Sequence, residues 1–212
     1  MRTHTLLKLV IAGICYTLIS PAQAAGDPGA GKFKFSTCLG CHGIPGYTNA
    51  YPTYHVPRLG GQHADYIVAA LKGYQSGERK HPTMHANAFS LSEQDMAEIA
   101  AYVSQIKPAI EEQRIIKGNI AEGQKKIQIC ATCHGEDGNG NKDNPNPTYP
   151  RLAGQHEDYL RKALADYKSG ARSNPIMSGM AAPLSEQDQA DLAAYFASQK
   201  NGLYVVKDKE TE

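Results

Sequence analysis

The chain contains one internal repeat, and this feature constrains its architecture most. A C-x-x-C-H sequence occurs at residues 38–42 and again at residues 130–134, an offset of 92. Three further segments recur at an offset of 93: Pro-Arg-Leu at 57–59 and 150–152, Gly-Gln-His at 61–63 and 154–156, and Leu-Ser-Glu-Gln-Asp at 91–95 and 184–188. The step from 92 to 93 places one inserted residue in the second copy, before Pro150, where a loop can absorb it. The repeat therefore predicts two domains of the same fold in tandem.

Residues 1–24 have the composition of a signal peptide. Basic Arg2 and Lys8 are followed by an apolar run and an Ala-Gln-Ala sequence at 22–24, which is the order of features expected of a cleaved export signal. The apolar run is shorter than the roughly 20 residues of a membrane-spanning helix. We expect cleavage before Ala25 and export of the mature protein.

The repeat also predicts the domain boundaries. We expect an N-terminal domain over residues 25–108, a linker over 109–117, and a C-terminal domain over 118–200. Pro108 disfavours continuation of a helix at the end of the first domain. Residues 201–212 are predicted to form a polar C-terminal tail.

Each copy predicts three helices joined by loops. The first helix leads into the cysteines, and the second is expected over residues 64–75 and 157–168, each followed by a glycine that can end it. The third should begin at Ser92 and Ser185, which are N-cap residues with acids in the next turn. Apolar residues follow at helical spacing, and no convincing strand pattern occurs. The predicted fold class is all-α.

The charge balance argues against a nucleic-acid partner. The whole chain has a formal charge of +1. Removal of residues 1–24 takes away Arg2 and Lys8 and no acid, so the mature chain carries −1. No basic run suited to a polyanion is present.

The C-x-x-C-H motif is the attachment sequence of c-type haem. Its two thiols can each form a thioether with one porphyrin, and the adjacent histidine can bind iron as the proximal ligand. The motifs predict covalent attachment at Cys38 and Cys41, and at Cys130 and Cys133, with His42 and His134 on iron. A thioredoxin-type dithiol would need a βαβ pattern, which is missing here. A zinc ribbon would need cysteine pairs about 15–20 residues apart, whereas the two pairs here are offset by 92.

The sixth iron ligand distinguishes a carrier from an enzyme, because a thioether sulfur closes the coordination sphere. Met84 lies eight residues before Ser92, and Met177 lies eight before Ser185. A repeat should reuse one geometry, so we expect Met84 and Met177 to bind iron. The alternative ligands are Met180, His81 and His85.

Residues after each motif suggest how the histidines are oriented. The carbonyls of Pro57 and Pro150 could accept a hydrogen bond from the imidazole N–H. The arginines that follow, Arg58 and Arg151, could meet a haem propionate or lie on a surface turn. His55 has no counterpart in the repeat and is expected to face solvent or a propionate.

With both motifs placed, the chain resembles the di-haem cytochrome c4 family over residues 25–200. The resemblance implies two class I cytochrome c domains, two covalent haem c groups and periplasmic location. It implies electron donation to a haem-copper terminal oxidase in a respiratory chain, and supply by a quinol-oxidising complex or a small electron carrier. Peripheral association with the inner membrane is a further implication.

Three functional classes fit these motifs: a free electron shuttle, the cytochrome subunit of a larger dehydrogenase, and a di-haem enzyme such as a peroxidase. An enzyme would need an open or displaceable iron position, whereas each copy offers a methionine. We therefore expect an electron-transfer protein rather than an enzyme. The sequence leaves the choice between shuttle and subunit open.

Overall fold

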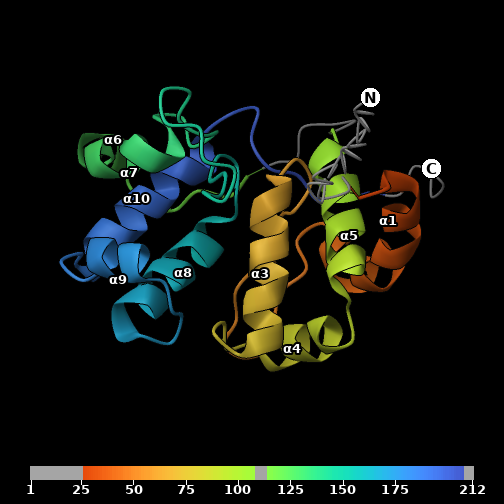
Figure 1. The fold of residues 1–212 in the computed structure, drawn as a ribbon. Coiled ribbons are helices and arrows are strands. Elements are labelled where there is room, and N and C mark those ends of the chain that lie inside the picture. Colours follow the sequence, from red (N-terminus) through yellow and green to blue (C-terminus); the bar gives the residue numbers. More distant parts are fainter. Residues whose placement is uncertain (1–25, 108–113, 208–212) are drawn as a thin grey trace, which may run out of the picture.

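The computed structural model describes residues 26–107 and 114–207, and helices dominate both parts. The first domain contains α1 (Pro28–Phe35), a 3₁₀ turn (Ser36–Cys38), α2 (Leu39–His42), α3 (Ala64–Ser76), α4 (Pro82–Phe89) and α5 (Glu93–Gln105). The second contains α6 (Ile120–Lys126), α7 (Gln128–His134), α8 (Glu157–Ser169), α9 (Pro175–Ala181) and α10 (Glu186–Ser198). The two groups of helices lie side by side, with α3 and α8 nearest the boundary (Figure 1).

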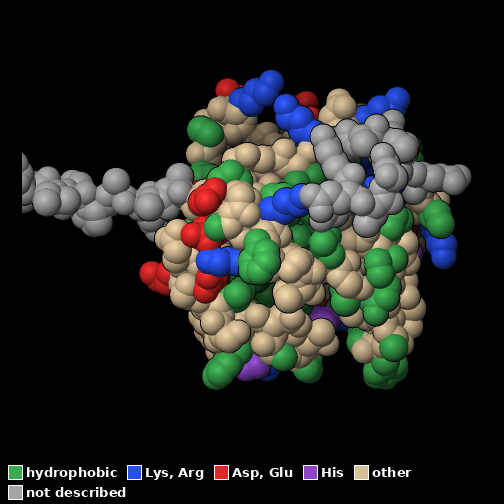
Figure 2. Space-filling view, turned by 90° about the vertical axis from the view of Figure 1, so that its right-hand side faces the viewer, with side chains coloured by type: hydrophobic (Ala, Val, Ile, Leu, Met, Phe, Trp, Pro, Cys, Tyr) green, Lys and Arg blue, Asp and Glu red, His purple; other side chains and the backbone are tan. Residues whose placement is uncertain are grey.

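The all-α prediction is confirmed. Within the described residues, β contacts are limited to three isolated bridges. None of the described helices combines the length and apolar character that a membrane-spanning helix needs. Figure 2 shows the face of the first domain, where acidic side chains gather at one edge beside a basic side chain. The lower part of this face, where α4 lies in Figure 1, carries few charged side chains.

The last helix of each domain, α5 and α10, begins where the sequence predicts. Ser92 and Ser185 each accept a hydrogen bond from the backbone N–H three residues on. Asp95 and Asp188 complete the capping boxes by accepting from the cap backbone. Each box satisfies N–H groups that the first helical turn would leave unpaired.

A matched glycine lets each of these helices cross the first helix of its domain closely. A Cβ at Gly31 would lie 1.9 Å from the carbonyl oxygen of Glu98, and one at Gly123 would lie 2.1 Å from that of Asp191. Only a residue without a Cβ fits such an approach. The helix pairs α1 with α5 and α6 with α10 therefore depend on these two positions.

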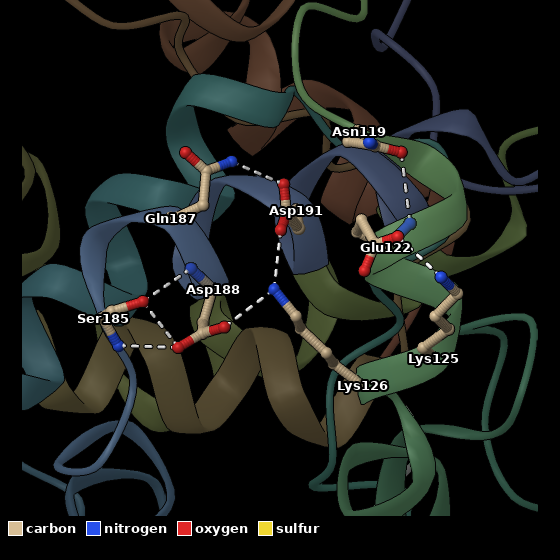
Figure 3. Close-up of polar contacts among 8 residues, drawn as sticks. All are labelled: Asn119, Glu122, Lys125, Lys126, Ser185, Gln187, Asp188 and Asp191. Carbon is tan, nitrogen blue, oxygen red and sulfur yellow. Dashed lines mark hydrogen bonds and ion pairs between the residues drawn. The ribbon is translucent and has the colours of Figure 1, made fainter.

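Salt bridges join the same pairs of helices. In the second domain, Lys126 of α6 lies 2.8 Å from a carboxylate oxygen of Asp188 and 2.6 Å from one of Asp191 (Figure 3). The hydrogen bond from Lys126 lowers the pKa of Asp191. The first domain repeats the arrangement with Lys34, Asp95 and Glu98.

Two glutamines hold the domains together by side-chain bonds to the backbone of the opposite domain. Gln155 accepts from the Arg58 N–H and donates to the Arg58 carbonyl, both at 2.9 Å. Gln62 makes the same pair of bonds to Arg151, at 2.8 and 3.0 Å. Because the Gly-Gln-His segment occurs in both copies, the interface uses one contact twice.

The segment after α10 differs from the predicted polar tail over residues 201–212. Residues 202–206, here called the C-terminal strap, are not a polar tail: Leu203, Val205 and Val206 are buried, and Val206 joins the hydrophobic core of the first domain. The sequence offers only three apolar residues there, too few for a periodic pattern. Residues 208–212 and most of the predicted linker lie outside the described residues, as does the predicted signal peptide.

Candidate haem sites

The four cysteines of the two motifs lie on short helical segments, are partly exposed and form no disulfide. Burial raises the pKa of the Cys38 and Cys130 thiols. Within the described parts of the chain, no group of three or more His, Cys, Asp or Glu side chains could hold a metal ion together. The zinc alternative therefore receives no support from the described residues.

Both motif histidines are buried and oriented as a proximal ligand requires. His42 and His134 have exposed fractions of 8% and 6%. The Nδ1 atom of His42 lies 3.0 Å from the Pro57 carbonyl oxygen, and that of His134 lies 2.8 Å from the Pro150 carbonyl oxygen. The predicted role of the two prolines is confirmed. A carbonyl bond at Nδ1 fixes the N–H tautomer there and leaves Nε2 free to bind iron.

Burial also favours the neutral form that binds metal. Desolvation lowers the pKa of both His42 and His134, while the proline carbonyls act in the opposite direction. Among the described residues, the Nε2 atom of neither ring has a hydrogen-bond partner. A buried ring nitrogen without a partner is costly, and iron coordination satisfies it. The donor set therefore fits haem c.

The methionines predicted as sixth ligands lie on helices that the sequence analysis missed. Met84 and Met177 are each the third residue of α4 and α9. The Met84 N–H donates to Nδ1 of His81, and the Met177 N–H donates to Oδ1 of Asn174. A cap residue followed by proline occurs at the start of both helices and is the signal that could have revealed them.

The alternative ligands have other surroundings. Met180 is more exposed than Met177, His81 caps α4 through Nδ1, and Nδ1 of His85 lies 2.8 Å from the Tyr74 carbonyl oxygen. Ligation by Met84 and Met177 stays a prediction, since their matched positions are what supports it.

The arginines and histidines after each motif lie at the domain boundary. Arg58 is buried and donates to the Gly154 carbonyl, so the reading as a surface turn is wrong for it. Arg151 donates to the Gly61 carbonyl. His55, expected to face solvent or a propionate, is partly exposed, lies 2.7 Å from Asp158 and stacks on the His156 ring. A loop position says little about burial when a second domain covers it.

A partly buried cluster of arginine and tyrosine between the domains was not predicted. Arg79 lies over the Tyr74 ring at 4.4 Å, and Arg172 lies over the Tyr167 ring at 4.5 Å. Arg172 donates to the Tyr66 hydroxyl of the other domain at 2.9 Å. Burial raises the pKa of this hydroxyl, but Arg172 and Arg79 outweigh burial and lower the pKa to about 8. Matched Gly-x-Arg sequences at residues 77–79 and 170–172 were the available signal.

Comparison with known proteins places this geometry among cytochromes. A family model described as cytochrome c matches residues 27–107 and residues 120–200. Cytochrome c4 of Azotobacter vinelandii is 33% identical over 213 residues, which cover 90% of this chain and 94% of the relative. The solved structure of Acidithiobacillus ferrooxidans cytochrome c4 is similar with a TM-score of 0.66 and 32% identity, over 77% of this chain and 99% of that chain.

A relative with another name is similar over almost the same length. The thiosulfate dehydrogenase electron acceptor of Stutzerimonas stutzeri is 29% identical over 208 residues, which cover 89% of this chain and 93% of the relative. The similarity therefore extends to a protein named for a specific electron donor.

Proposed function

Because the chain belongs to the cytochrome c family, and within it to the di-haem cytochromes c4, we propose that it carries electrons in the periplasm to a haem-copper terminal oxidase. The chain is a di-haem c-type electron carrier, with one haem c attached covalently at Cys38 and Cys41 and one at Cys130 and Cys133. The observation that supports a carrier most strongly is the matched pair of buried histidines, each held by a proline carbonyl.

A bound haem c supplies an iron centre that gains and loses one electron at a time. The residues of the chain attach the haem, bind its iron and orient the ligands. With haem c bound, the cysteines would hold the porphyrin and His42 and His134 would bind iron through Nε2, while the proline carbonyls keep each imidazole in one orientation. Met84 and Met177 complete the two coordination spheres in this proposal.

Closed coordination is the basis for proposing a carrier rather than an enzyme. With Met84 and Met177 as iron ligands in addition to His42 and His134, a bound haem would have no iron position left for a small-molecule substrate. Both helices that carry the methionines are fixed by side-chain caps, at His81 and Asn174. Such caps hold the first helical turn in place, which favours methionines that stay bound.

A second electron donor is favoured by the relative from Stutzerimonas stutzeri, whose name makes it the acceptor of a thiosulfate dehydrogenase. A quinol-oxidising complex or a small electron carrier is the first candidate donor, and a thiosulfate dehydrogenase is the second. Either donor is compatible with delivery to an oxidase and with peripheral association at the inner membrane. With either donor, the chain acts as a free electron shuttle.

The test uses protein isolated from a periplasmic extract. Its mass should correspond to residues 25–212 with two haems. The reduced protein should support rapid, cyanide-sensitive oxygen uptake by washed membranes that contain a haem-copper oxidase. Thiosulfate with a thiosulfate dehydrogenase is supplied in a parallel sample to identify the donor. A protein that is retained in a detergent-stable dehydrogenase complex, and does not reoxidise with oxidase membranes, contradicts the proposal.

A further inference from the structure

The C-terminal strap connects the end of the second domain to the first haem site. Its Leu203 N–H donates to the Ala153 carbonyl of the second domain at 2.7 Å. Three residues on, the Val206 N–H donates to the backbone carbonyl of His42 at 3.2 Å. The strap thus begins on one domain and ends on the backbone of the histidine that belongs to the other.

The corresponding carbonyl in the second domain is satisfied from within that domain. The His134 carbonyl accepts from the Gly140 N–H at 2.8 Å. Gly140 belongs to the loop that follows its own motif, six residues after His134. The same backbone group is therefore held locally in the second domain and by the far end of the chain in the first.

A second pair of hydrogen bonds follows the same rule: the second domain makes the bond from its own loop, and the first domain makes it with the strap. In the second domain the Ala153 N–H donates to the Gly138 carbonyl at 3.1 Å. The repeat aligns Ala153 with Gly60, and the Gly60 N–H donates to the Tyr204 carbonyl at 2.9 Å. Tyr204 and Val206 are two residues apart, as are Gly138 and Gly140. The strap therefore supplies, in the first domain, both contacts that residues 138–140 supply in the second.

The first domain lacks its own version of this loop because its chain takes another path after the motif. Gly135 has a φ of 80°, a conformation that favours glycine, and the loop then turns back toward His134. In the first domain Gly43 is right-handed helical, with a φ of −99°. The following residues form a turned segment in which Thr48 pairs with His55, whose side chain contacts Asp158.

Packing reinforces the two backbone bonds. Val206 is fully buried in the core cluster that contains Phe35 and Val103. Its carbonyl oxygen would lie 3.1 Å from a Cβ built at Gly43, so the strap also runs close beside the motif. The strap lies outside both segments that match the cytochrome c family model, residues 27–107 and 120–200. It is an addition to the two family domains.

We propose that the C-terminal strap positions His42 and completes the first haem site, so that ligation of the first haem depends on the strap and ligation of the second does not. This inference rests on the proposed function in that it takes His42 and Met84 as iron ligands. Val206 and Tyr204 are positioning residues, since they act through the backbone of His42 and through Gly60. A backbone bond at the histidine carbonyl limits movement of the residue that holds iron.

The experiment compares variants of the exported di-haem protein. One variant ends after Asn201 and loses the strap, and its matched control ends after Lys207 and keeps it. Val206→Pro removes the N–H that donates to the His42 carbonyl, and Val206→Ala shortens the side chain but retains that N–H. The readouts are the shifted methyl signals of ligated methionines in the reduced protein, and amide exchange at Gly60 and Gly140. Haem content is checked by mass in every sample.

Loss of the strap should speed amide exchange at Gly60 by about tenfold or more, because its hydrogen-bond acceptor is removed. Gly140, whose N–H donates to the His134 carbonyl within the second domain, should exchange at the unchanged rate. The Met84 methyl signal should broaden or split in the shortened chain and in Val206→Pro, but be retained in Val206→Ala and in the control. Equal effects on both domains, or no effect on either, overturn the proposal. If the parent protein shows no methionine signals, the ligand assignment fails, and the Gly60 and Gly140 rates still decide the role of the strap.

Discussion

Replacement of Met177 by alanine is expected to remove half of the near-red Fe(III)–thioether absorption band and to lower the reduction potential of one haem. Met177 occupies the third position of α9, as Met84 does in α4. A thioether opposite histidine raises the potential and closes the iron, so its loss lowers the potential and opens one iron to external ligands. Potentiometric titration with spectra of the oxidised protein measures both effects.

Met180→Ala is the matched control for this prediction. Met180 lies three residues further along α9, and its side chain is partly exposed, with a residue exposure of 38%. Its replacement should leave the band and both potentials unchanged. A band that halves in Met180→Ala and persists in Met177→Ala would show that the matched position of the methionines is not what selects the ligand.

Gln155→Leu is expected to produce the largest loss of stability among single changes at the domain interface. Gln155 is buried, and its side chain satisfies both the N–H and the carbonyl of Arg58. Leucine removes both of these buried bonds, at about 1–3 kcal/mol for each. Urea unfolding of the di-haem protein should therefore show a fall of a few kcal/mol in the free energy of unfolding.

Two variants calibrate this result. Gln62→Leu breaks the matched pair of bonds to Arg151, but those bonds are only partly buried, so its effect should be smaller. Gln124→Leu changes an exposed residue of α6 and should alter the free energy of unfolding by less than about 0.5 kcal/mol. A fall below about 1 kcal/mol in Gln155→Leu would mean that water replaces the lost bonds and that the interface is held elsewhere.

The features predictable from the sequence are those that local chemistry determines. Ser92 and Ser185 begin helices because their hydroxyls cap the next turn. Gly77 and Gly170 end α3 and α8 in the left-handed conformation, as expected. The proline carbonyls behind His42 and His134 could be anticipated because they follow the motifs at nearly equal distances.

The features missed by the sequence analysis depend on contacts between distant residues or on short elements. Helix α9 has seven residues, too few for an apolar period to be recognised. Arg58 looks like a surface residue until Gln155, 97 positions away, covers it. The strap was the most instructive miss, because Val206 contacts His42 from the opposite end of the chain.

Carbon monoxide tests the central claim most directly. That claim is an electron carrier with two haems, in which histidine and methionine fill both axial positions of each iron. The gas binds reduced haem iron only where an axial position is open or a ligand leaves. The reduced, exported protein at neutral pH should keep its spectrum almost unchanged under carbon monoxide. Stoichiometric binding at one haem, accompanied by turnover of peroxide, would contradict the claim and identify that domain as an enzyme site.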